Sequence, residues 1–172
     1  MGEAIDTARL HLRPPRAEDA EPLNALIQDP RVYRNVGRIP PNAPLQNTRE
    51  FIERTAASRA ARTGLSCLIF RDGELIGTTG GGDGGRHGPF DVGYWITPPA
   101  WGQGYATEAF TALLAWLQSE WGLKAVTAGY FVDNPASGRV LRKAGFLPAG
   151  RRLYPCLGRE CDVECIDMGL IF

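Results

Sequence analysis

The segment from Trp101 to Thr107, Trp-Gly-Gln-Gly-Tyr-Ala-Thr, combines residue types that suit it to bind phosphate. It follows a strand-like run and opens an amphipathic helical run. Gly102 and Gly104 let the main chain approach a ligand without an intervening Cβ. Amides of the first helical turn lack partners within the helix and lie at the positive end of its dipole, so they attract anions. The pattern predicts a phosphate site. A tight turn whose glycines serve geometry alone is the alternative.

Hydrophobic periodicity places this segment inside an α/β sheet. Alternating apolar residues predict strands, and apolar residues at helical spacing predict amphipathic helices. The helix after the glycine segment has the longest apolar stripe, from Ala106 to Trp121, which is expected to belong to the core. The expected strands are 9–13, 65–70, 74–79, 92–96, 124–132, 146–154 and 160–171, and the expected helices are 17–28, 47–64, 106–121 and 135–144.

Short local signals set several boundaries. Asp72-Gly73, between two strand-like runs, predicts a type I′ hairpin turn. Asn47, followed three residues later by Glu50, resembles a capping box and predicts a helix start. Asn134-Pro135 predicts another helix start, with Asn as the N-cap and Pro at the first helical position. The segment 29–46 contains four prolines and is expected to be irregular.

Composition indicates an ordinary globular protein. The 172 residues suggest a single domain that spans 1–172. The 19 basic and 19 acidic residues balance, so no overall field favours nucleic acid or an anionic membrane as a partner. The N-terminal residues lack the order of a signal peptide, and no apolar run is long enough to span a membrane. We therefore expect a cytoplasmic protein.

Other chemistry-bearing residues predict no further site. The four cysteines and two histidines lack metal-ligand spacing, so no metal is expected, and the alternation in Cys161–Cys165 favours cysteines as small core residues. Gly80–Gly85 satisfies G-x-G-x-x-G, but a strand follows it. A dinucleotide site is therefore rejected in favour of a loop that joins antiparallel strands. His87, beside it, is expected to be a solvated loop residue.

Several motifs, in order along the chain, resemble GNAT N-acetyltransferases. The resemblance is greatest to the RimJ/RimL-type branch, which includes ribosomal-protein-alanine acetyltransferases. Trp101–Ala109 is similar to the family's acetyl-CoA loop, and Asn134–Phe146 is similar to its second cofactor segment. Thr7–Ala20 and Gly158–Val163 resemble the branch's N-terminus and final strand. The combination is far more specific than the glycine segment alone.

The resemblance implies a GNAT fold of class α/β (α+β). Its sheet would be mixed, mostly antiparallel, of about seven strands flanked by helices, with acetyl-CoA in the splay between the fourth and fifth strands. Loop amides would bind the pyrophosphate, the strand end would pair with pantetheine, and one strand N–H would steady the thioester oxygen. Trp101 stands where many members carry Gln or Arg. The implied cofactor-binding residues are Tyr94, Trp95, Ile96, Trp101, Gln103, Gly104, Tyr105, Ala106, Thr107, Asn134 and Ser137.

The resemblance also implies catalytic candidates. Many members protonate the departing thiolate from a tyrosine, but Leu141 occupies the matching position here. Ser137 is the nearest replacement donor, with first-turn capping as its alternative role. Asp91 is a candidate base or water-orienting group, with a solvated strand carboxylate as the alternative. Asn134 is as well suited to cap its helix as to bind the cofactor, and Glu108 is expected to offset the helix dipole.

Two classes of function stay open. The first is an acetyl-CoA-dependent N-acetyltransferase that acts on a primary amine of a protein N-terminus, a polyamine or an aminoglycoside. The second is an acyl-CoA-binding module with weak or no catalysis, which the missing tyrosine keeps open. Either could be a monomer or a homodimer. Direct transfer, without an acetylated enzyme, is expected because neither histidine lies in the cofactor segments to activate a nucleophile.

The proline-rich segment 29–46 is expected to form one wall of the acceptor cleft, with Arg31, Tyr33 and Arg34 as candidate contacts. The reason is its length and irregularity between two helices, since long loops on a rigid scaffold often carry function. A plain surface connection is the alternative.

Overall fold

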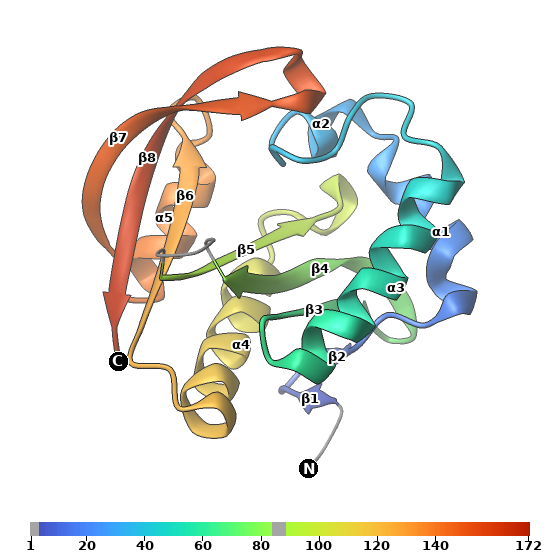
Figure 1. Ribbon diagram of the computed structural model, residues 1–172, viewed down its shortest axis with the longest axis horizontal. Coiled ribbons are helices and arrows are strands. Elements are labelled where there is room, and N and C mark those ends of the chain that lie inside the picture. Colours follow the sequence, from blue (N-terminus) through green and yellow to red (C-terminus); the bar gives the residue numbers. More distant parts are fainter. Residues whose placement is uncertain (1–3, 84–88) are drawn as a thin grey trace.

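The computed structural model describes residues 4–83 and 89–172, whose strands form one eight-stranded sheet (Figure 1). Its order is β1-β2-β3-β4-β5-β6-β8-β7. Neighbouring strands are antiparallel except β5 and β6, which are parallel. The expected mixed, mostly antiparallel sheet is confirmed, with one more strand than expected. The strands are β1 (Ile5–Asp6), β2 (His11–Arg13), β3 (Gly64–Arg71), β4 (Glu74–Asp83), β5 (Phe90–Ile96), β6 (Ala125–Phe131), β7 (Leu147–Cys156) and β8 (Cys161–Ile171).

Helices flank both faces of this sheet (Figure 1). On one face α3 packs on β3 and α1 on β4, whereas on the other α4 packs on β5 and α5 on β6. No helix in the described part of the chain is both long and apolar enough to cross a membrane. The α-helices are α1 (Ala20–Ile27), α2 (Pro30–Tyr33), α3 (Leu45–Ala61), α4 (Tyr105–Trp121) and α5 (Pro135–Lys143), and short 3-10 turns cover Ala17–Asp19, Pro98–Ala100 and Leu157–Arg159.

The main core lies between the sheet and α4. The predicted apolar stripe of that helix is buried, with Ala109, Phe110, Leu113 and Leu117 fully enclosed. It packs against inward-facing strand residues such as Val92, Val126 and Met168. The glycine segment is therefore held between a central strand and the most deeply buried helix, which gives it a rigid frame.

The sheet splits between β5 and β6. Only Phe90 with Val126 and Asp91 with Thr127 are in register, and beyond them the two strands diverge (Figure 1). They are the fifth and sixth strands, because the two-residue β1 adds one at the start. This opening is the splay that the resemblance implied.

Several local predictions are confirmed by backbone geometry. Asp72 and Gly73 both have positive φ, 50° and 81°, as a type I′ turn requires. The Asn134 side chain accepts a hydrogen bond from the Ser137 amide and so caps α5. Gly145, with a φ of 94°, follows the end of that helix.

Two predictions near the prolines are wrong. The helix expected from Asn47 begins at Leu45, because the Asn47 amide already bonds the carbonyl of Pro44, the residue that precedes the helix. The segment 29–46 is not wholly irregular, since Asp29 caps the short helix α2 with Pro30 at its first position. This is the same Asx-Pro signal that predicted α5.

Two further predictions need correction. Gly80–Asp83 belongs to β4 rather than to a loop, and glycines suit it because β3 and β5 backbones lie close on both sides. The rest of that glycine run and His87 lie outside the described residues. Cys67, Cys156 and Cys165 are buried as expected, but Cys161 is exposed because it is the first residue of β8, beside the β7–β8 turn.

Candidate active site

The glycine segment forms an open cradle at the start of α4. Gly102 and Gly104 have φ values of 75° and 82°, which favour glycine over any residue with a Cβ. Gly104 occupies the N-cap position and has no side chain to cap the first turn. The segment 101–104 is exposed, so the first-turn amides of α4 can donate hydrogen bonds to an anionic ligand. These features fit the predicted phosphate site.

Two arginines from distant parts of the chain flank this cradle: Arg9 lies in the turn between β1 and β2, and Arg71 ends β3. The Arg9 guanidinium donates to the Gln103 carbonyl at 3.0 Å and to the Glu108 carboxylate at 2.7 Å. Arg9 and Arg71 both lie over the Tyr105 ring, 4.5 and 5.3 Å from its centroid. The prediction omitted both arginines, and the nearer one is 94 residues from its loop partner. Arg9 pairs with Glu108 and Arg71 with Asp72, so the two guanidinium groups offset nearby carboxylates that would otherwise repel an anion at the cradle.

Glu108 has a structural role at this helix start. Burial alone would raise its pKa, but hydrogen bonds from Thr7 and Arg9 hold the pKa below its ordinary value. The Arg9 guanidinium compensates the charge, which would otherwise oppose an anion at the cradle. Trp101 also has a structural contact, because its indole N–H donates a hydrogen bond to the Ile96 carbonyl at 2.6 Å. This bond ties the loop to the end of β5.

On the α4 side of the splay, Tyr94 of β5 meets Ser137 of α5. The Tyr94 Oη lies 2.9 Å from the Ser137 Oγ and 3.1 Å from the Ser137 carbonyl oxygen. The Tyr94 ring packs on Phe110 of α4, with centroids 4.9 Å apart. Burial raises the pKa of Tyr94 to about 12, so its hydroxyl stays protonated. Leu141, which stands in place of the family's tyrosine, is buried in the core.

Asp91 lies on the opposite side of the sheet from Tyr94. Side chains alternate along a strand, and Val92 and Tyr94 face α4, so Asp91 faces away from it. The Thr127 hydroxyl donates to the Asp91 carboxylate at 3.1 Å. Partial enclosure by the neighbouring strands raises the pKa of Asp91, although this hydrogen bond and the charges of Arg152 and Arg38 oppose the rise. The two predicted catalytic residues thus lie on opposite sides of the splayed strands.

Several glycines lie around Asp91 on the surface of the sheet that faces away from α4. We call this surface, formed by β5, β6, β7 and β8, the open face. Registered neighbours share one face, which places Thr127, Gly129, Gly169 and Asp167 on it. A Cβ added at Gly93, Gly150 or Gly169 would meet no other atom of residues 4–83 and 89–172 within 4 Å. Arg152 donates to Asp167 at 2.8 Å along one side. The open face can therefore accommodate an extended ligand close to the main chain.

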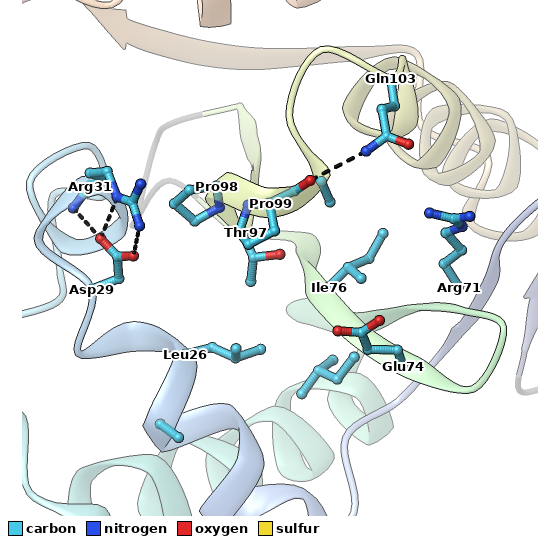
Figure 2. Close-up of a pocket in the computed structure, with 13 residues that line it drawn as sticks. Leu26, Asp29, Arg31, Arg71, Glu74, Ile76, Thr97, Pro98, Pro99 and Gln103 are labelled. Carbon is cyan, nitrogen blue, oxygen red and sulfur yellow. Dashed lines mark hydrogen bonds and ion pairs between the residues drawn. The ribbon is translucent and has the colours of Figure 1, made fainter.

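The three predicted contacts of segment 29–46 do not converge on one cleft. Arg31 pairs with Asp29 at 2.7 Å and lines a cavity of about 280 Å³ opposite Gln103 (Figure 2). Tyr33 lies against Gly158, and the Arg34 carbonyl accepts from Arg159 at 2.7 Å. Their roles toward an acceptor stay predictions.

Arg159 connects three segments beside the splay. It donates to both Asp133 oxygens, to the Arg34 carbonyl and to the Asn35 side chain. The Asn134 amide also donates to Asn35 at 3.3 Å. The end of α2, the turn before α5 and the β7–β8 turn are therefore held together, a connection that no local sequence pattern predicts. No group of three or more His, Cys, Asp or Glu in residues 4–83 and 89–172 could hold a metal ion.

Comparisons with known proteins agree with this arrangement. The family model for the acetyltransferase (GNAT) domain matches residues 9–147. The protein named "Uncharacterized N-acetyltransferase YoaA" of Bacillus subtilis (strain 168) is 32% identical over 153 residues, 87% of this chain and 86% of that protein.

Two solved structures share the fold over nearly the whole chain. One is the acetyltransferase that modifies the N-terminal serine of ribosomal protein L7/L12 from Salmonella typhimurium, with a TM-score of 0.84 and 19% identity over 99% of both chains. The other is the microcin C7 self-immunity acetyltransferase MccE in complex with acetyl-CoA and AMP. Its TM-score is 0.80, with 18% identity over 96% of this chain and 94% of that one.

Proposed function

The chain belongs to the GNAT acetyltransferase family and is an acetyl-CoA-dependent N-acetyltransferase, and we propose that it acetylates the primary amine at the end of an extended peptide by direct transfer. The observation that carries the proposal is the splay between β5 and β6. It opens onto the glycine cradle and Ser137 on one side and onto Asp91 and the open face on the other. Two substrates can meet there from opposite sides, which makes a covalent intermediate unnecessary.

The cradle at 102–107, with Arg9 and Arg71 beside it, holds the pyrophosphate of the donor. The unpaired edge of β5 from Val92 onward hydrogen-bonds the pantetheine arm, as a strand would be bound in β-augmentation. Acetyl-CoA supplies an activated carbonyl. The chain's own contribution is to bind that thioester, exclude water and set the positions of the proton donor and acceptor.

The transfer itself moves two protons: one leaves the attacking nitrogen and one is added to the departing sulfur. The carbonyl carbon forms a bond to the amine nitrogen and loses its bond to sulfur, whose electron pair leaves with the sulfur. An ammonium group must first lose one proton to solvent to become a nucleophilic amine; in the transfer the amine nitrogen then gives up one more proton and the departing sulfur gains one. We assign the protonation of sulfur to the Ser137 hydroxyl and the removal of the proton that the amine gives up in the transfer to Asp91, directly or through water. Their placement on opposite sides of the splay supports this division.

The open face favours a peptide over a compact polycation. Glycines at positions 93, 150 and 169 leave room for a main chain, and Asp91 can attract an ammonium group. The acetyltransferase from Salmonella typhimurium modifies a protein N-terminus, which is consistent with such an acceptor. The protein's overall charge is balanced, so no strong acidic field recruits an aminoglycoside or polyamine.

Thiol release from acetyl-CoA across a panel of peptides, polyamines and aminoglycosides tests the activity. We expect release only with peptides that have a free N-terminus. Release with polyamines or aminoglycosides alone would redirect the acceptor assignment, and tight acetyl-CoA binding without release for any amine would favour the binding-module alternative.

Gly104→Asn tests the cradle, because Asn tolerates the left-handed backbone and adds a Cβ there. We expect acetyl-CoA affinity by calorimetry to fall at least about tenfold, the effect of losing one good hydrogen bond. Gly122→Asn is the matched control, at the opposite end of α4 with a similar φ of 66°, where no atom of the described residues lies within 4 Å of an added Cβ. Equal affinities in the two variants would reject the cradle.

A further inference from the structure

In the contact between Tyr94 and Ser137, the hydroxyl hydrogen of Tyr94 has two possible acceptors on the serine. The Tyr94 hydroxyl can donate to the Ser137 carbonyl at 3.1 Å or to the Ser137 Oγ at 2.9 Å. If it donates to the carbonyl, the serine hydroxyl donates to Tyr94. If it donates to Oγ, the serine hydrogen is free. The two arrangements differ only by rotation of two hydroxyl groups.

We propose that Tyr94 is the positioning residue for Ser137, and that the pair switches between these two arrangements during acetyl transfer. This inference rests on the proposed role of Ser137 as the proton donor. Before transfer, the serine hydrogen is held by Tyr94 while the tyrosine hydrogen is held by the Ser137 carbonyl. As charge collects on sulfur, the serine hydroxyl turns toward it and the tyrosine hydroxyl turns toward Oγ.

The switch keeps the serine oxygen hydrogen-bonded at every stage. When Ser137 gives its hydrogen to sulfur, negative charge grows on Oγ, and a hydrogen bond from a neutral phenol stabilises that charge. A serine alkoxide is a stronger base than the Tyr94 phenolate, even with the pKa of Tyr94 raised to about 12, so Oγ takes the Tyr94 hydrogen as its own passes to sulfur. The proton on sulfur comes from Ser137, Tyr94 restores the serine, and solvent returns a proton to Tyr94 after the thiol departs. Tyr94 thus acts through Ser137 without contacting the reacting atoms.

Surrounding contacts hold both groups in place for this task. The Tyr94 ring is packed against Phe110, which fixes the direction of its hydroxyl. The Ser137 amide is bound by the Asn134 side chain at 3.3 Å, which fixes the serine main chain. The hydroxyl groups are left as the movable parts. Removing the phenol oxygen therefore changes the hydrogen bond while leaving the packing in place.

Tyr94→Phe removes that oxygen and keeps the ring. With acetyl-CoA and a peptide acceptor, we expect kcat to fall about tenfold, the effect of one hydrogen bond, with KM for acetyl-CoA unchanged. In a Ser137→Ala background, itself slowed about 10²-fold as expected for loss of a general acid, Tyr94→Phe should cause no further fall. Tyr130→Phe is the matched control, since its ring packs beside Gly138 of the same helix.

A second donor separates positioning from simple structural support. The acetyl thioester of a nitrothiophenol releases a thiolate that needs no protonation, so the defects of Tyr94→Phe and Ser137→Ala should both largely disappear with it. A Tyr94→Phe defect that persists with this donor, or in the Ser137→Ala background, would overturn the switch. Near-normal turnover of Ser137→Ala would instead overturn the proposed role of Ser137 as proton donor. The Ser137→Ala variant therefore tests the donor, and the Tyr94→Phe variant tests the switch.

Discussion

Arg159 and Asp133 are joined by a two-pronged ion pair, with Nη1 to Oδ2 at 2.6 Å and Nη2 to Oδ1 at 3.1 Å. The same guanidinium donates to the Arg34 carbonyl and packs over the Phe131 ring, 5.0 Å from its centroid. The side chain of Arg159 is largely buried, whereas Asp133 is half exposed. One arginine therefore fixes the turn before α5 to the segment between α2 and α3.

Arg159→Lys should loosen this connection while keeping the charge, because lysine cannot make the fork of bonds. We expect the KM for a peptide acceptor to rise about tenfold, as for one lost charge-assisted hydrogen bond, with the KM for acetyl-CoA unchanged. Steady-state kinetics with each substrate varied in turn provides the measurement. Arg151→Lys, whose partner Glu164 lies on the α5 side of the sheet, is the control. Equal effects of the two variants would mean that the Arg159 connection does not position the segment 29–46 that is predicted to line the acceptor cleft.

Asp91 should set the acidic limb of the pH profile. The carboxylate form is required as a proton acceptor, and enclosure raises its pKa, so kcat/KM should fall as pH drops through a value above that of an ordinary aspartate. Asp91→Asn should lower kcat/KM about 10²-fold and remove this limb. A limb that remains in Asp91→Asn would belong to another group.

Thr127→Val gives an independent check on the same group. It deletes the hydroxyl that donates to the Asp91 carboxylate, so the pKa of Asp91 should rise further and the acidic limb should move to higher pH. Thr127→Ser keeps the hydroxyl and should leave the limb where it is. A limb unmoved in Thr127→Val would show that the hydrogen bond does not influence the reacting carboxylate.

The ion pair between Arg13 and Asp19 should govern acid stability. Burial alone would raise the pKa of Asp19, but the Arg13 guanidinium and the Arg16 amide hold it below its ordinary value. Its stabilisation is therefore complete above the unfolded-state pKa and is lost as pH falls through the folded-state value. Asp19→Asn should cost about 3 kcal/mol at neutral pH, as for a broken buried pair.

Denaturant unfolding at several pH values measures this effect. The difference between wild type and Asp19→Asn should shrink toward acid pH. Glu21→Gln, which removes an exposed partner of Arg49, is the control and should cause no measurable change. A difference that is independent of pH would mean that packing, and not ionisation, accounts for the loss.

Cysteine labelling should distinguish the four thiols. Cys161 is exposed, whereas Cys67, Cys156 and Cys165 are buried, and burial raises the pKa of Cys67 to about 11. Iodoacetamide should therefore modify Cys161 alone in the native protein. Cys161→Ser should abolish labelling and leave turnover unchanged, as direct transfer requires. Fast labelling of a second thiol, or loss of turnover, would contradict this prediction.

Elements with local signals were predictable from the sequence. The turn at Asp72-Gly73 and the start of α5 at Asn134-Pro135 depend on the conformations of adjacent residues, and both are confirmed. The start of α3 was not, because Asn47 has the residue type of a cap while the backbone had already become helical before it. The glycine strand at 80–83 was missed because its cause is the closeness of two other strands.

Much of the site depends on contacts between distant residues. The sequence predicts the glycine cradle and offers Ser137 as a candidate proton donor, yet Tyr94 and Ser137 are 43 residues apart and Arg159 lies 125 residues from Arg34. No periodicity reports such pairings. The family resemblance implies a main-chain role for Tyr94 at the strand end, whereas in the structure its side chain contacts Ser137.

The divergence of β5 from β6 should also make the stability of the folded chain depend on the concentration of acetyl-CoA. It leaves a sheet edge within the body of the protein, and the donor would complete that edge as a strand does. A ligand bound only by the folded state raises the free energy of unfolding, by about 2.7 kcal/mol at a hundredfold excess over Kd. We therefore expect the chain to unfold more readily, and a protease to cleave it faster, when acetyl-CoA is scarce. The abundance of the enzyme would then follow the concentration of its own substrate.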